Sequence, residues 1–424
     1  MKFKLLPLAA AITTSLVSMS LYAEEVTAVK PELTQPADPL YDRQQPLVLT
    51  EEMIQQVLAN VPDTGFKFTG YARYGFHYND DIKDYVGAEG QKAGNAAGRL
   101  GNEGNGGEFQ FNKAFISSND AVWNVSVMLE HWGDNVGLKK FYAGVTNIFE
   151  SQPNAYLWAG RDFHQRPQQG LNDYFWMMHD GQGAGIKNLD LGGLKLDFAG
   201  VAQASSGTGD SGVYAITSKL HGISLGELGS LSILANYGFE SDQYDDNGVQ
   251  TNPDSSDAFQ IGAAIDSSWS MGGTQLILRY SENADNGVFW KTEDLTALYA
   301  SFSGNVQTSD SFNTEYLVAY HDYDDKSSES RTNYSAIVRP MMTWNDVHST
   351  WLEAGYSLVD YDESDENSAW KVTLSQNVSF GFAGARPMIR FYATVGSADN
   401  QVSSNTYDAK QDTLALGAMF ESWW

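Results

Sequence analysis

The feature that most constrains the fold is an alternation of apolar and polar residues with a period of two, which begins at Phe66 and recurs to the end of the chain. In the first such stretch, 66–78, the even positions are mostly aromatic or small and the odd positions mostly polar. Successive residues of a β-strand point to opposite faces, so the pattern predicts a strand with one apolar and one polar face. After residue 23 no stretch approaches 18 consecutive apolar residues, which excludes a helical membrane protein.

About 18 segments of the chain share this alternation. They are 66–78, 108–118, 122–132, 140–148, 155–161, a weak one near Gly181, 186–191, 194–201, 213–220, 228–239, 258–269, 274–281, 295–302, 312–322, 333–344, 350–358, 370–378, 386–395 and 413–424. Short turns such as Gly192-Gly193 alternate with long acidic loops such as 243–257 and 396–412. This layout is typical of an outer-membrane barrel, so we expect an all-β transmembrane antiparallel β-barrel.

The need to pair every strand and the pattern of the last strand both support a closed barrel. An open sheet edge in lipid leaves amides unsatisfied, so all strands must pair, and about 18 strands enclose a water-filled lumen. In the last strand Leu414, Leu416 and Phe420 share one face with the terminal Trp424, which is the register expected for a lipid-facing strand. A secreted β-sandwich or propeller fits the alternation but does not explain aromatic residues at both ends of the apolar face.

Composition excludes several classes of function. The chain holds 53 acidic and 26 basic residues, for a formal net charge of -27, so a nucleic-acid partner is not expected. It contains no cysteine, which excludes disulfides, thiolate zinc sites and cysteine nucleophiles. The seven histidines form no i, i+4 pair, the acidic loops lack EF-hand spacing, and no nucleophile–base set is recognisable. We therefore expect no catalytic residues, no metal site and no cofactor.

The N-terminus indicates export from the cytoplasm. Lys2 and Lys4 precede an apolar run that ends at Ala23, before Glu24 and Glu25, which is the pattern of a signal peptide at 1–23. Residues 24–65 are rich in proline and contain one short amphipathic helix candidate, so we expect a periplasmic extension there. The transmembrane barrel is then expected to span 66–424.

Several motifs along the chain together resemble the maltoporin-type sugar-specific porins. They are Gly70-Tyr71-Ala72-Arg73, Arg99-Leu100-Gly101-Asn102-Glu103, 158–166, 183–190, Arg386-Pro387-Met388-Ile389-Arg390 and the terminal Trp423-Trp424. The resemblance covers roughly Gly70 to the C-terminus and rests on the order and spacing of the motifs. It implies an 18-stranded, homotrimeric barrel of the bacterial outer membrane, in contact with its lipid, with a third loop folded inward.

The resemblance also implies functional positions. The residues that match lumen aromatics, which in this family form a slide for sugar rings, are Tyr71, Trp132, Trp423 and, by shared parity with Gly384, Phe382. The residues that match the charged constriction are Arg73, Lys139, Arg166, Asp173 and Phe175. The family reaches an aromatic residue at the place of Trp132 into a neighbouring subunit. Lys139 stands where an arginine is usual and Phe175 where a tyrosine is expected, and Gly273 and Gly384 fall where two slide aromatics would be.

These residues have simpler interpretations that remain open. Tyr71 and Trp423 can belong to the membrane-interface girdle, and Trp132 can serve trimer packing. Arg73 and Arg166 can simply balance nearby carboxylates.

The sequence therefore predicts a carbohydrate porin through which oligosaccharides, maltodextrin-like in chemistry, diffuse passively. Aromatic rings would stack on the apolar faces of the sugar, and charged groups would replace water on its hydroxyls. The missing slide aromatics leave a non-specific porin, or one for another solute, as the alternative on the same barrel. A polysaccharide hydrolase with paired lumen carboxylates and a surface adhesin using the acidic loops are further alternatives.

Overall fold

The computed structural model describes residues 66–79, 85–117, 119–133, 135–205, 210–244, 247–250, 252, 256–326, 330–380, 386–402 and 410–424. All described residues belong to the unit Pro39–Trp424. The predicted signal peptide at 1–23, the predicted extension at 24–65 and Phe382 lie outside the described residues. Among the described residues, no helix is long and apolar enough to cross a membrane.

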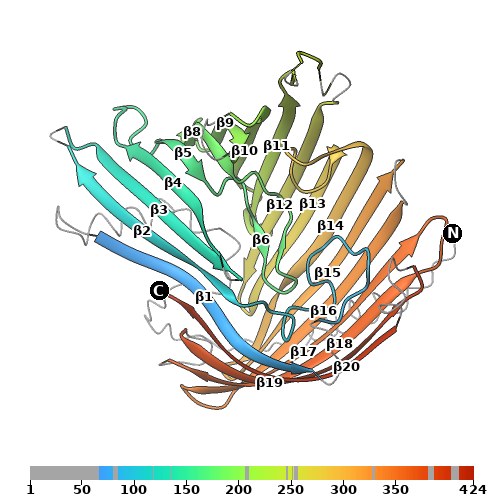
Figure 1. The fold of residues 1–424 in the computed structure, drawn as a ribbon. Coiled ribbons are helices and arrows are strands. Elements are labelled where there is room, and N and C mark those ends of the chain that lie inside the picture. The colour runs from blue at the N-terminus through green and yellow to red at the C-terminus, as the bar shows by residue number, and fades with distance from the viewer. Residues whose placement is uncertain are drawn as a thin grey trace. The chain divides into compact units, whose positions relative to one another are not determined.

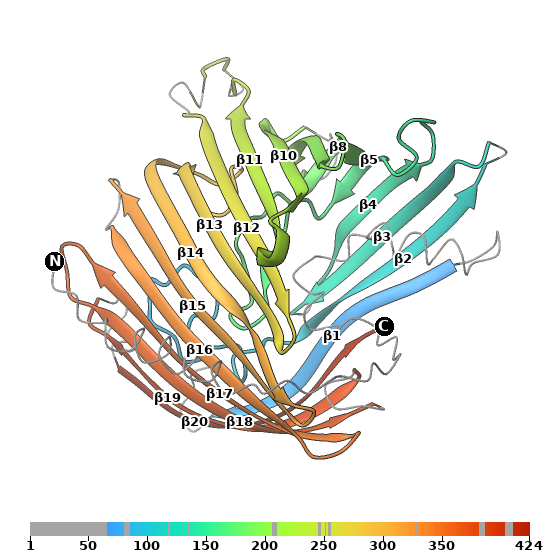
Figure 2. The ribbon, with the colours of Figure 1, turned by 180° about the vertical axis from the view of Figure 1, so that it is seen from behind.

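Eighteen antiparallel strands form one sheet that closes on itself (Figures 1 and 2). The strands are β1 Phe66–Asn79, β2 Gly106–Ile116, β3 Val122–Trp132, β4 Val136–Thr146, β5 Tyr156–Asp162, β8 Gly181–Asp190, β9 Lys195–Gln203, β10 Val213–Ser224, β11 Ser230–Glu240, β12 Ala258–Trp269, β13 Gly272–Ala284, β14 Lys291–Ser309, β15 Phe312–Asp325, β16 Arg331–Thr343, β17 His348–Tyr361, β18 Asn367–Ser379, β19 Met388–Asn400 and β20 Lys410–Trp423. Each strand pairs with its neighbours along the chain, and β1 pairs with both β2 and β20. The predicted all-β barrel of about 18 strands is confirmed.

One detail of the strand prediction is wrong. The segments expected separately near Gly181 and at 186–191 form the single strand β8. Glycines at 181, 183 and 185 carry no apolar pattern, and the pairing of β8 with β9 shifts register between Ile186 and Leu189. This bulge moves the following side chains to the other face, which hides the continuity of the strand from the sequence.

The two faces of the wall have opposite chemistry. In β19, Arg390 and Thr394 are buried and Phe391 and Val395 exposed, in strict alternation. In β1 the exposed residues are again at even positions: Phe66, Phe68, Tyr74, Phe76 and Tyr78. Apolar side chains therefore cover the outside of the ring and polar ones its inside, as in outer-membrane barrels.

Two long connections contact the polar inner face. One comprises 85–105, between β1 and β2, and the other 163–180, between β5 and β8, which includes the paired short strands β6 Gln168–Gln169 and β7 Tyr174–Phe175. Residues 85–105 lie along β16 to β18 (Figure 1): Ser335 Oγ donates to the carbonyl of Ala96 at 2.6 Å, and Lys371 Nζ donates to that of Gly98 at 2.6 Å. The motif Arg99–Glu103 supported the family resemblance, but no prediction placed 85–105 against the inner face.

Candidate functional site

A row of polar and aromatic side chains crosses the inner face of four adjacent strands. Trp423 of β20 lies opposite Tyr71 of β1, Tyr71 opposite Glu108 of β2, and Glu108 opposite Glu130 of β3. Lys139 of β4 extends the row, because its Nζ lies 3.0 Å from Glu130 Oε1. The alternation that forms the strands thus brings residues from the two ends of the barrel sequence into one line.

An aromatic pair stands beside this row. Trp132 ends β3 and lies opposite Gly106, which in turn lies opposite Arg73 of β1. A Cβ on Gly106 would lie 2.3 Å from the Trp132 ring, so only glycine lets the indole cross this position. The Trp132 ring centroid is 6.3 Å from that of Tyr71 and 5.1 Å from Arg73 Cζ, and Trp132 keeps 38% of its surface exposed. Trp132 therefore contacts aromatic and charged residues of its own chain.

Arg73 connects three parts of the barrel interior. Its Nη2 lies 3.3 Å from Asp173 Oδ2, in the 163–180 connection, and its Nε donates to the carbonyl of Gly104 at 2.9 Å. Gln168 also donates to Asp173. A charge pair with fixed hydrogen-bond geometry therefore lies next to the Tyr71–Trp132 pair.

Arg166 is held between two aromatic rings. Its Cζ lies 4.0 Å from the ring centroid of Phe163 and 4.1 Å from that of Phe175, and its Nε lies 3.3 Å from Asp180 Oδ2. The guanidinium thus covers one face of Phe175. Burial raises the pKa of Asp180 to about 6, against the lowering effect of Arg166.

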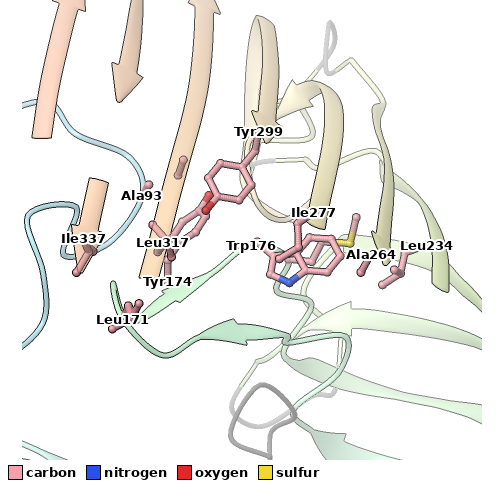
Figure 3. Packing of buried hydrophobic residues seen from close by; sticks show 12 residues of the cluster. Ala93, Leu171, Tyr174, Trp176, Leu234, Ala264, Ile277, Tyr299, Leu317 and Ile337 are labelled. Atoms are coloured by element: carbon pink, nitrogen blue, oxygen red, sulfur yellow. The ribbon is translucent and has the colours of Figure 1, made fainter. Parts of the chain in front are cut away.

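The 163–180 connection is fixed to the opposite wall by Arg279 of β13. This buried guanidinium donates to Tyr174 Oη at 3.0 Å and to the carbonyl of Trp176 at 2.6 Å, and it also pairs with Asp285. Apolar packing supports the same contact, as Figure 3 shows for Tyr174 beside Tyr299 and for Trp176 beside Ile277.

A buried ionic network that the sequence analysis did not assign fixes the end of 85–105. Glu421 of β20 accepts hydrogen bonds from Arg99 at 3.1 Å, from Arg390 at 3.1 Å and from Arg386 at 2.7 Å. Glu103 pairs with Arg390 at 2.8 Å and with Arg99 at 3.3 Å. Burial alone would raise the pKa of Glu103, but Arg390 and Arg99 outweigh burial and lower this pKa to about 2. The network therefore stays charged at neutral pH.

All predicted slide and constriction residues lie in one region, except Phe382, which is outside the described residues. Tyr71, Trp132, Arg73 and Asp173 meet directly. Lys139 joins them through Glu130, and Arg166 with Phe175 forms the adjoining cluster, in which Arg166 Nη1 lies 3.9 Å from Glu108 Oε1. Trp423 lies beside Tyr71 in the row, with Arg386 Cζ 4.3 Å from its ring centroid. In the described part of the chain, no three His, Asp or Glu side chains are grouped so that they could hold a metal ion.

The chain is similar to known proteins in sequence and in structure. The sequence model of the LamB porin family matches residues 66–424. Among solved structures, OpdL of Pseudomonas aeruginosa superposes with a TM-score of 0.51 at 10% identity, covering 86% of this chain and 99% of that chain. OccD3 (OpdP) of the same organism gives 0.48 at 11% identity over 85% and 91%. OmpT of Vibrio cholerae gives 0.45 at 12% identity over 86% and 99%.

Proposed function

This chain belongs to the LamB porin family, and we propose that it is a carbohydrate porin through which oligosaccharides cross passively. It is a porin of the bacterial outer membrane, with an apolar outer face for lipid and a polar lumen. Selectivity for sugars goes beyond family membership and rests on the lumen lining.

The observation that carries the proposal is the contact of an aromatic pair with a charge pair. Tyr71 and Trp132 present ring surface, and Arg73 with Asp173 presents fixed donors and acceptors directly beside it. A pyranose has apolar C–H faces and a rim of hydroxyls, so it matches both surfaces at once. Solute that binds weakly at successive sites can also leave, which is the requirement for transport.

We expect Tyr71→Ala to weaken sugar binding, while ion conductance stays equal or rises. The ring provides the stacking surface, whereas the hydroxyl donates to Glu421 at 3.1 Å, so Tyr71→Phe is the control that keeps the ring. The measurement is the block of ion current in a planar bilayer by malto-oligosaccharides, sucrose or short β-glucans. Unchanged sugar block in Tyr71→Ala would remove Tyr71 from the binding path.

The charged constriction is part of the proposal. We place it where 163–180 meets β1, with 163–180 as the inward-folded third loop and Arg73, Lys139, Arg166, Asp173 and Phe175 as its lining. Trp423 would continue the aromatic path toward the short-turn end, and Phe382 is kept as a further candidate from its parity with Gly384. The contacts of Arg73 with Asp173 and of Arg166 with Phe175 support this assignment.

Acidification is expected to change the ion selectivity of the channel. With its pKa raised to about 6, Asp180 is charged near pH 7 and loses its charge as the pH falls through that value. The charge of Arg166 is then less compensated, so cation selectivity, read from the reversal potential in a salt gradient, falls between about pH 7 and pH 5. The Asp180→Asn variant should already have low cation selectivity at pH 7, and its selectivity should not fall further on acidification. If the selectivity of this variant still falls between about pH 7 and pH 5, another group causes the change.

We also propose that the barrel is a homotrimer, on the evidence of a wall sector unsuited to lipid. Strand β5 has only seven residues, whereas a transmembrane strand needs about 9–11. Arg161 of β5 lies opposite the outward-facing Phe141, and a charge on a lipid face costs about 2–4 kcal/mol near the midplane. In the next outward row Ala159 lies between Ala143 and Ala184, which leaves a flat face for a second copy.

Spin labels test this sector, because a chain without cysteine accepts single labelled cysteines. At Ala159→Cys, on β5, we expect shielding from oxygen dissolved in lipid and short distances between the labels of one assembly. At Ala336→Cys, an outward alanine of β16 on the longer wall, we expect oxygen access and long distances. Equal oxygen access at both positions would place β5 against lipid.

A general porin remains the second candidate function. Gly273 lies in β13 where the family has a slide aromatic, so part of the aromatic path is absent. An ion current that no sugar blocks in the wild-type protein would favour this candidate.

A further inference from the structure

Three aromatic rings meet on the inner face toward the end of β1 from which the long connections leave. His77 belongs to β1, Tyr392 to β19, and Tyr85 to the 85–105 connection. The His77 ring centroid is 6.1 Å from that of Tyr392 and 6.4 Å from that of Tyr85. None of these residues matches a slide or constriction position, so the group lies outside the site described above.

Gly417 of β20 allows the group to form. It lies directly opposite both His77 and Tyr392, so the two rings flank a position without a side chain. A Cβ on Gly417 would lie 2.1 Å from Tyr392 Cζ, which means that the phenol crosses the glycine. Tyr392 Oη then lies 3.1 Å from His77 Nδ1. His77 of β1 and Tyr392 of β19 are thus held against each other across Gly417 of β20.

The exposed surface of this group belongs mainly to Tyr85. Tyr85 is 46% exposed, whereas Tyr392 is 9% exposed. A large aromatic ring that keeps this much exposed surface and has another ring beside it is suited to stacking on an apolar ligand face.

The group is separated from the Tyr71–Trp132 pair along the barrel. His77 follows Tyr71 by six residues on the same face of β1, which corresponds to about 20 Å at 3.3 Å per residue. Asn105 lies between them, bonded to both the N–H and the carbonyl of Gly75 at 2.7 and 3.1 Å. A solute arriving from the long-connection side therefore meets Tyr85 before it reaches Tyr71.

The charges beside the group compensate one another. Glu103 pairs with Arg390 and Arg99, and Glu421 pairs with the same two arginines, so each charge next to Tyr392 already has a partner. A ligand of this site therefore gains nothing from carrying a net charge, and ring stacking is the main attraction that the site offers.

We propose that Tyr85, backed by His77 and Tyr392, is an entry site that stacks on the ring of a neutral saccharide at the long-loop mouth of the channel. This inference rests on the proposed carbohydrate porin. The site raises the rate at which sugar enters from that side, while the affinity of the Tyr71–Trp132 pair is set separately.

The test uses channels inserted in one orientation in a planar bilayer, with a linear malto-oligosaccharide added to one side at a time. Tyr85→Ala should lower the association rate from the long-loop side by about two- to tenfold, the worth of one aromatic contact. Entry from the short-turn side should not change. Tyr85→Phe should behave as wild type, because stacking needs only the ring. The matched control is Tyr356→Ala, which removes an exposed tyrosine from the outer face of β17.

The remaining outcomes distinguish failure of the entry site from failure of the proposed function. Sugar block with an unchanged association rate from the long-loop side would overturn the entry site and leave the proposed function intact. An equal fall from both sides would also overturn it, because the substitution would then have altered the channel as a whole. A wild-type channel that no sugar blocks would overturn the proposed function, and the entry site with it.

Discussion

Replacing Glu421 by glutamine is expected to lower the free energy of unfolding of the barrel by about 3–5 kcal/mol, because three arginines lose their shared carboxylate. Arg99, Arg386 and Arg390 all donate to Glu421, and each of these side chains is buried. Glutamine keeps the volume, so the effect reports on charge and not on a cavity. Arg99 and Arg390 still pair with Glu103, so Arg386 is the arginine most affected by the loss.

The matched control is Glu315→Gln. Glu315 also pairs with an arginine, Arg339, at 2.8 Å, but Arg339 keeps Glu353 at 2.6 Å, and Glu315 is partly exposed. This substitution should cost about 1 kcal/mol or less. Urea unfolding of both variants in lipid vesicles, followed by tryptophan fluorescence, gives the comparison. Equal stability of the two variants would mean that water or segment movement compensates the buried arginines.

Strand patterning made the barrel predictable. A period of two is local information, so the exposed aromatics of β1 and the outward Phe420 and Trp424 followed from the sequence. The same parity predicted that Tyr71 and Arg73 face the lumen side. The register shift in β8 broke the pattern, and the prediction of two strands there was wrong for that reason.

The interior connections were not predictable in the same way. Arg99 and Glu103 occur in a recognisable motif, but a loop has no periodicity that points a side chain at Glu421, more than 300 residues away in sequence. Trp132 illustrates the same limit. The glycine at 106 and the register between β2 and β3 bring its ring onto Tyr71 of the same chain, a contact that the motif alone did not indicate.

The second large effect concerns the 163–180 connection. Arg279→Met should release this segment from the wall, because Arg279 donates to both Tyr174 Oη and the Trp176 carbonyl. The same substitution removes the arginine that pairs with Asp285. Burial opposes the ionised form of Asp285, but His321 and Arg279 together lower its pKa. Removing one partner of a buried pair costs about 3–5 kcal/mol, and here that cost falls on the local anchoring of the segment.

Released residues 163–180 should be cleaved by a protease added on the long-loop side, and sugar block of the current should weaken. The double variant Arg279→Met/Asp285→Asn removes the uncompensated carboxylate, so it should recover part of the protease resistance; the recovered part measures the charge penalty. Tyr174 and Trp176 also pack against Tyr299 and Ile277, which Arg279→Met leaves in place (Figure 3). If Arg279→Met resists the protease and binds sugar as wild type does, this apolar contact alone positions the segment, and the guanidinium is dispensable for the constriction.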